Sequence, residues 1–169
     1  MDVRGALSRG IILDTNLLLV LGIGLVQPAL VGRFKRTEAY SPNDFRNLRG
    51  LVQSSPRLVT TPHVLTEFSN LLFRPLFHHR LRSERVLAAV RQMTGLHVEK
   101  DVLIEHAALA RLGFTDLGIA HVARRDHYLV LTDDESLFCH LSGDGCVVIN
   151  VNHLRSREFI QGGQSTDVD

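Results

Sequence analysis

Cysteine is scarce in this sequence, because only Cys139 and Cys146 occur in 169 residues. They lie seven residues apart, with no CxxC pair and no histidine at metal-site spacing. This pattern excludes both a disulfide framework and a structural zinc site. So few cysteines are typical of a reducing compartment, and we expect a cytoplasmic protein.

A strong charge of either sign is also lacking, because the formal net charge is +1. No global field therefore points to nucleic acid or to a membrane surface as the partner. Lysine is nearly absent, since the sequence has only two lysines, Lys35 and Lys100, compared with 17 arginines. The planar arginine fork suits phosphates, whereas the base composition of a genome produces the same bias. The sequence leaves both explanations open.

No apolar run is long and uninterrupted enough for a membrane helix, which needs about 20 apolar residues. The longest run, over 11–26, follows Arg4 and Arg9 and faintly resembles a signal peptide. Asp14 and Asn16 interrupt it, and no Ala-x-Ala cleavage site follows. We therefore expect neither a secretory signal nor a membrane partner.

Length and patterning predict one α/β domain with a sizeable core. The expected strands are 11–13, 57–61, 96–99, 128–132 and 146–150, and the expected helices are 15–31, 44–52, 63–73, 81–93, 101–112, 116–126 and 136–141. Their alternation predicts a three-layer α/β/α sandwich with a central, mostly parallel sheet. We expect a single domain over 1–160, an elaboration within it over 32–57, and a disordered tail over 161–169.

Local signals predict several helix ends. Pro62 is expected in the first turn of the helix over 63–73, and Pro75 is expected to end that helix. Asp101 is expected to cap the helix over 101–112, and Gly113 to close it.

The stretch 10–16, Gly-Ile-Ile-Leu-Asp-Thr-Asn, reads as a short apolar strand that ends on an acid. In open parallel sheets, ligands bind in the crevice outside the carboxyl ends of the strands. Asp14 at that edge can point its charge into the crevice. The alternative is that Asp14 or Asn16 only caps the following helix.

Three further places carry an acid that local structure does not require. Glu67 borders the apolar stripe of its helix, and Asp116 begins a helix whose same face continues with apolar residues. Asp133 and Asp134 follow the strand over 128–132. We therefore expect two acids at strand ends and two helix acids pointing toward the buried side, all near one edge of the sheet.

Each acid also has an ordinary structural explanation. Asp116 favours the positive end of its helix dipole, Thr132–Glu135 matches a capping box, and Glu67 has Arg111 as an available ion-pair partner. Taken together, however, several carboxylates near one buried edge are costly without compensation. A divalent cation with oxygen ligands is the usual compensation.

These segments, in this order, resemble the motifs of PIN-domain nucleases over residues 11 to about 150. The matching residues are Asp14-Thr15-Asn16, Glu67 within 64–68, Asp116 within 115–120, and Leu131-Thr132-Asp133-Asp134. The resemblance implies a parallel α/β/α sandwich, bound Mg²⁺ or Mn²⁺, and hydrolysis of RNA phosphodiester bonds. Many bacterial members resemble the toxin half of VapC-type toxin–antitoxin pairs, which implies an antitoxin partner. Homodimers are common among similar proteins.

The resemblance also implies the roles of site residues. The expected catalytic and metal-binding acids are Asp14, Glu67, Asp116 and Asp134. The Thr-x-Asp pattern favours Asp134 as the fourth acid, but Asp133 lies nearer the strand end and stays a candidate ligand. Thr15, Asn16 and Thr132 are expected to orient the acids by hydrogen bonds.

An acidic site repels RNA, so a basic rim is expected beside it. The segment 74–82 offers Arg74, Arg80 and Arg82 together with Phe77 for base stacking. The same segment also reads as an ordinary solvated loop. A second candidate is the cluster of Arg33, Lys35 and Arg36.

Other classes fit less well. The interval from Asp14 to Glu67 is longer than in compact VapC-like toxins, because it contains 32–57. A receiver-type domain would place a lysine at the end of a late strand, where this chain has Asn150 to Asn152, and a haloacid dehalogenase-type phosphatase would have an aspartate at Asn16. The alternative that stays open is a catalytically silent PIN-like module that binds RNA or a partner protein.

Overall fold

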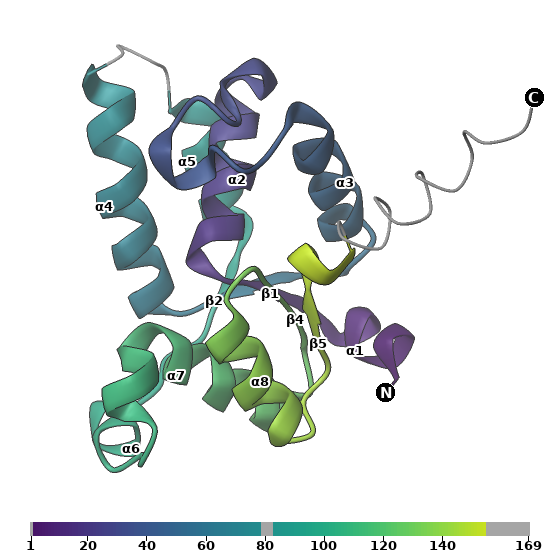
Figure 1. Cartoon of the computed structure of the whole chain (residues 1–169), viewed down its shortest axis with the longest axis vertical. Coiled ribbons are helices and arrows are strands. Elements are labelled where there is room, and N and C mark those ends of the chain that lie inside the picture. The colour runs from purple at the N-terminus through teal and green to yellow at the C-terminus, as the bar shows by residue number, and fades with distance from the viewer. Residues whose placement is uncertain (1, 79–82, 155–169) are drawn as a thin grey trace, which may run out of the picture.

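Five parallel strands form the centre of the molecule. The structure is a computed structural model that describes residues 2–78 and 83–154 (Figure 1). The strands are β1 (Ile11–Leu13), β2 (Leu58–Thr60), β3 (Thr94–Gly95), β4 (Leu129–Thr132) and β5 (Val148–Asn150), in the spatial order β3-β2-β1-β4-β5. All four pairings are parallel.

Helices cover both faces of this sheet. They are α1 (Val3–Arg9), α2 (Thr15–Val26), α3 (Pro42–Gln53), α4 (Pro62–His78), α5 (Glu84–Gln92), α6 (Lys100–Ile104), α7 (Leu109–Asp126) and α8 (Glu135–Gly143), with short 3₁₀ turns η1 (Pro28–Leu30) and η2 (Lys35–Thr37). In Figure 1 the strands cross the middle of the view, with α2–α5 above them and α6–α8 below. The predicted three-layer α/β/α sandwich is therefore confirmed.

The central strand is β1, which pairs with β2 on one side and β4 on the other. Ile11, Ile12 and Leu13 are all buried, which explains why this strand is apolar throughout and does not alternate. From β1 the chain builds β2 and β3 on one side, then returns to build β4 and β5 on the other. The sheet therefore has its topological switch point between the carboxyl ends of β1 and β4.

The apolar run over 11–26 forms β1 and α2, and it lies in the protein core. No helix in the described part of the chain has both the length and the apolar character needed to cross a bilayer. The helix α1, which sequence patterning did not predict, precedes this run. The Asp2 side chain caps it by accepting a 2.8 Å hydrogen bond from the Gly5 amide.

The elaboration over 32–57 packs on α2 through α3. Phe45 and Leu48 are its buried anchors. The approach is close, because a Cβ atom placed on Gly24 would lie 2.1 Å from the Phe45 ring. Gly24 therefore allows α3 to lie against α2. The expected tail over 161–169 lies outside the described residues.

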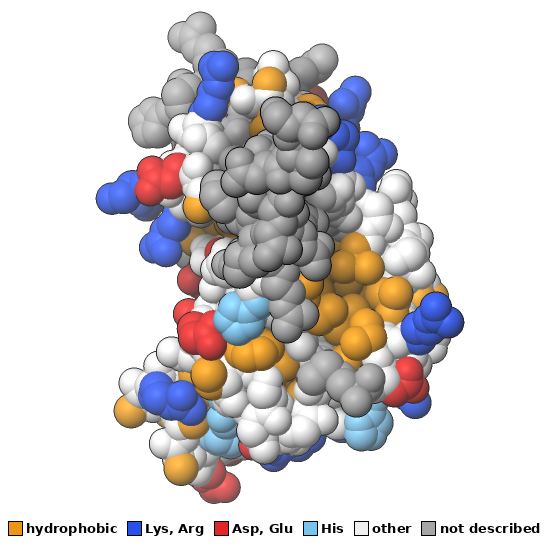
Figure 2. Space-filling model, turned by 45° about the vertical axis from the view of Figure 1, so that its right-hand side comes forward, with side chains coloured by type: hydrophobic (Ala, Val, Ile, Leu, Met, Phe, Trp, Pro, Cys, Tyr) orange, Lys and Arg blue, Asp and Glu red, His pale blue; other side chains and the backbone are white. Residues whose placement is uncertain are grey.

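Beyond α3, the structure contains a hollow between α3 and the end of β5, with a volume of about 210 Å³. Its apolar lining includes Leu48, Leu51, Ile149, Val151 and Leu154. Figure 2 shows hydrophobic side chains gathered on this face of the molecule.

Two expected helix ends are wrong. Helix α4 does not stop at Pro75 but continues to His78, because Leu72 and Leu76 are buried on either side of the proline and hold the helix against the core. The helix expected over 101–112 is broken, because α6 ends at Ile104 and α7 begins at Leu109. In that gap the His106 ring nitrogen accepts the Ala108 amide, which removes that amide from a helical ladder.

Other expected boundaries are also wrong. Glu99, and not Asp101, occupies the N-cap position of α6. Gly113 has the positive φ of 76° that a helix end needs, but it lies at a kink within α7. The third strand is Thr94–Gly95, two residues before the predicted range, and the Leu96 amide extends its pairing by donating to the Thr60 carbonyl.

Candidate active site

The carboxylate of Asp14 joins the ends of β1 and β4. It caps α2 by accepting a 2.8 Å hydrogen bond from the Leu17 amide on Oδ1. Its Oδ2 accepts from the Thr132 hydroxyl at 2.5 Å and from the Asp133 amide at 2.9 Å. Asp14 therefore has the capping role that the sequence allowed, and it also lies at the topological switch point.

Burial strongly affects the charge on Asp14, which is 5% exposed. Its pKa is raised to about 7, first by burial and then by the neighbouring Asp133 carboxylate. The three hydrogen bonds from Leu17, Thr132 and Asp133 oppose this rise in pKa but do not cancel it.

Asp133 is held by two side chains from distant parts of the chain. Asn16 donates to its Oδ1 at 3.0 Å, and the Tyr40 hydroxyl donates to its Oδ2 at 2.6 Å. Tyr40 is buried and belongs to the elaboration over 32–57, which therefore reaches the site. Sequence analysis did not predict a role for Tyr40, since no local pattern relates it to an acid 93 positions later.

A second group of acids contains Asp116, Glu67 and Asp134. Asp116 is half-buried on α7, and its pKa is raised to about 7 by burial, then by Asp134 and Glu67. Glu67 on α4 accepts a 3.0 Å hydrogen bond from the Thr15 hydroxyl. Contrary to the expectation that it points toward the buried side, Glu67 is exposed, because it lies at the border of the apolar stripe and faces outward.

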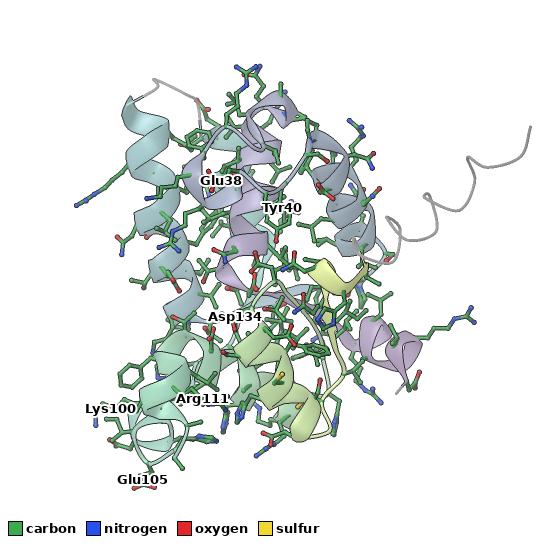
Figure 3. The ribbon with its side chains drawn as sticks, viewed as in Figure 1. Glu38, Tyr40, Lys100, Glu105, Arg111 and Asp134 are labelled. Carbon is green, nitrogen blue, oxygen red and sulfur yellow. The ribbon has the colours of Figure 1, made fainter. Side chains whose placement is uncertain are left out.

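Asp134 caps α8. Its Oδ1 accepts a 2.9 Å hydrogen bond from the Leu137 amide, and its side chain is exposed. The capping box predicted over Thr132–Glu135 is wrong, because the N-cap is Asp134 and Thr132 remains in β4. Glu135 instead accepts a 2.8 Å hydrogen bond from the Asn150 side chain. Figure 3 shows Asp134 at the level of the sheet, where the two helical layers meet.

Hydrogen bonds connect the two acid groups. The fully buried Thr132 donates to Asp14 and accepts from the Asp134 amide at 2.9 Å. Thr15, Asn16 and Thr132, the three residues expected to orient the acids, each donate to a different carboxylate. The structure thus brings together all five acids that the sequence singled out.

The chemistry of these donors suits a hard divalent cation, which prefers carboxylate oxygens. None of the ion pairs between described residues involves any of the five acids. At the same time, among the described residues no set of three or more His, Cys, Asp or Glu side chains is arranged so that it can hold a metal ion. The donors therefore fit a cation in type, while their arrangement is not that of a formed metal site.

The predicted basic rim is only partly described. Arg74 is exposed on α4, and Arg33, Lys35 and Arg36 are exposed before and within η2. The side chain of Phe77 lies outside the described part of the structure, as do Arg80 and Arg82.

Comparison of the chain with protein-family models, with curated proteins and with solved structures gave no match. The resemblance to PIN-domain nucleases therefore depends on the motifs of this chain alone.

Proposed function

We propose that the protein is a metal-dependent endoribonuclease of the PIN type, acting in the cytoplasm. The observation that carries the proposal is a pair of acid groups linked by hydrogen bonds of Thr132 beside the ends of β1 and β4, with the pKa values of Asp14 and Asp116 raised to about 7. Burial, and then repulsion from neighbouring acids, disfavours the charged forms of these two carboxyl groups, and bound Mg²⁺ or Mn²⁺ would offset that cost.

In this proposal, Asp14, Glu67, Asp116 and Asp134 hold the cation, with Asp133 beside them. A bound Mg²⁺ or Mn²⁺ supplies a water of lowered pKa and charge stabilisation for the leaving oxygen. Glu67 and Asp134 are exposed, so their side chains have room to change rotamer when a cation binds.

The chain itself contributes orientation. Three donors fix the carboxylate of Asp14, and Asn16 and Tyr40 fix both oxygens of Asp133. We keep Asp134 as the fourth ligand from the Thr-x-Asp pattern; its Oδ1 caps α8, whereas Asn16 and Tyr40 hold the two oxygens of Asp133. Asp133 is then a positioning residue for Asp14.

The test is cleavage of labelled single-stranded RNA in Mg²⁺, in Mn²⁺ and in EDTA. We expect metal-dependent cleavage by the wild type and a loss of about 100-fold or more in Asp116→Asn. The matched control is Asp126→Asn, which alters the other end of α7 and should cleave normally. A folded Asp116→Asn protein that cleaves at the wild-type rate would refute the assignment.

The second candidate is a silent module that binds RNA or a protein. The observation that favours it is the absence, within the described residues, of an acid set arranged to hold a metal ion. A wild-type protein that neither binds Mn²⁺ nor cleaves RNA would support this alternative over the nuclease.

The narrower proposal of a toxin is supported by the family resemblance. Its test is whether a small reading frame lies directly upstream of the gene and whether the encoded protein blocks cleavage. Sedimentation of the free protein and of that complex would also test the expected homodimer.

A further inference from the structure

Two hollows adjoin α4, and Glu67 of the second acid group lines one of them. One has a volume of about 580 Å³ and is lined by Pro62, His63, Thr66, Glu67, Asn70 and Thr115. The other has a volume of about 290 Å³, and its lining includes Phe34, Lys35, Arg36, Asn70 and Arg74. Asn70 lines both, and we refer to the surface along α4 that carries the two hollows, from Thr115 of α7 to η2, as the groove.

An aromatic surface lies at the α7 end of this groove. Phe114 is 43% exposed, and its ring stacks on His63 with centroids 6.1 Å apart and an interplanar angle of 13°. The preceding Gly113, with φ of 76°, turns the chain at the kink from which Phe114 projects. Phe114 is thus supported by a second ring while much of its own surface stays open to solvent. An open, supported ring is the kind of surface on which unpaired bases stack.

Positive charge lies at the η2 end. Lys35 and Arg36 project from η2 and Arg74 from α4, and all three are exposed. None of them forms an ion pair with another residue that the structure describes. Such groups are suited to neutralise backbone phosphates.

One acid of the proposed cleavage site, Glu67, lies between these two ends. Glu67, Asn70 and Arg74 follow one another at helical spacing on one face of α4, so the acid of the site stands between His63 and Arg74. At 1.5 Å per residue, the distance along the helix from His63 to Arg74 is about 16 Å. A short run of nucleotides can therefore contact both ends at once.

We propose that single-stranded RNA binds in this groove, with one base stacked on Phe114 and its backbone phosphates on Lys35, Arg36 and Arg74. The inference rests on the proposed function, because it places the scissile bond beside Glu67 and Asp116. The exposed face of Phe114 is covered more readily by an unpaired base than by one held in a duplex stack, so this surface favours single-stranded over duplex RNA.

Binding is measured by fluorescence anisotropy, using a labelled 12-nucleotide single-stranded RNA in EDTA, where metal-dependent cleavage cannot occur. Phe114→Ala should weaken binding by about 5- to 100-fold, the effect of one stacked base. Phe114→Tyr keeps the ring and should bind like the wild type. Ile104→Ala removes another exposed apolar side chain, on α6, and should also leave affinity unchanged.

Charge is tested in the same assay. Arg36→Gln and Arg74→Gln should each lower the slope of log affinity against log salt by about one. Arg9→Gln changes an exposed arginine of α1, a helix that lies on the other side of the molecule from α4 in Figure 1, and should leave the slope unchanged. The same RNA annealed to its complement should bind more weakly than the single strand.

These experiments distinguish failure of the RNA-binding proposal from failure of the nuclease proposal. If Phe114→Ala and Phe114→Tyr bind RNA equally well, or if the duplex binds as tightly as the single strand, the groove proposal is overturned even when the protein cleaves RNA. If the Phe114, Arg36 and Arg74 variants bind RNA as expected but neither Mg²⁺ nor Mn²⁺ supports cleavage, the RNA-binding proposal is supported and the nuclease proposal is refuted. If the wild type binds no RNA and instead binds a protein through this face, the groove proposal is wrong.

Discussion

Thr132 uses its hydroxyl twice, as donor to Asp14 and as acceptor from the Asp134 amide. It is fully buried at the end of β4, so water cannot replace either bond. A single oxygen therefore fixes the relative positions of two acids that come from different strands and loops.

Thr132→Val keeps the shape of this side chain and removes both hydrogen bonds. We expect a loss of about 1–3 kcal/mol in the free energy of unfolding, because an amide and a carboxylate oxygen lose a partner in a buried place. RNA cleavage should fall by about 10- to 100-fold, as for other residues that orient metal ligands. Urea denaturation and the cleavage assay measure the two effects. Thr132→Ser keeps the hydroxyl and is the control, and equal behaviour of both variants would show that the hydroxyl has no such role.

Among the secondary-structure elements, helices α2 and α3 can pack closely because Gly24 has no side chain. A Cβ atom on Gly24 would lie 2.1 Å from the Phe45 ring, so Gly24→Ala must displace α3 or the ring. We expect a loss of about 1–3 kcal/mol in stability from this overpacking. Gly50 lies within α3 with nothing within 4 Å of its added Cβ, so Gly50→Ala should stabilise by about 0.5–1 kcal/mol. Thermal unfolding of the pair measures this contrast, and effects of the same sign would contradict it.

Local chemistry made much of this architecture predictable. The apolar triplet at 11–13 indicated a strand buried on both faces, and the expected acids do meet at one edge of the sheet. The sequence-based predictions that were wrong concern features that depend on contacts between distant residues. Pro75 was expected to end a helix that Leu72 and Leu76 hold together from the core side, and His106 breaks a helix through a ring contact that no periodicity reveals. Tyr40 reaches Asp133 only after the chain has folded.

For the whole molecule, the raised pKa values of Asp14 and Asp116 predict how stability changes with pH. Each folded pKa is about 7 against an ordinary value of 3.8, so between these values the folded state binds more protons than the unfolded state. The free energy of unfolding of the metal-free protein should therefore fall as pH rises from about 4 to 7.

Asp116→Asn removes one of the two carboxyl groups whose raised pKa makes stability depend on pH. In EDTA it should be more stable than the wild type at pH 8, and this advantage should shrink toward pH 4, where the wild-type acid is protonated. Adding Mn²⁺ at pH 8 should raise the melting temperature of the wild type more than that of the variant, because only the folded wild type gains the full site. Melting curves of the wild type and of Asp116→Asn at the two pH values test this prediction. A difference in stability between the two proteins that does not change with pH would refute it.

The hydrogen bond from Tyr40 to Asp133 has a consequence for the protein during limited proteolysis. The elaboration over 32–57 contributes no strand to the sheet, yet it supplies a direct partner to an acid of the candidate site. A protease cut between Gly32 and Tyr40 would leave all five strands uncut, while Tyr40 would be held by the chain on its α3 side alone. Loss of the proposed nuclease activity would then precede loss of the fold, and the cut protein would still display the circular dichroism of an intact α/β protein.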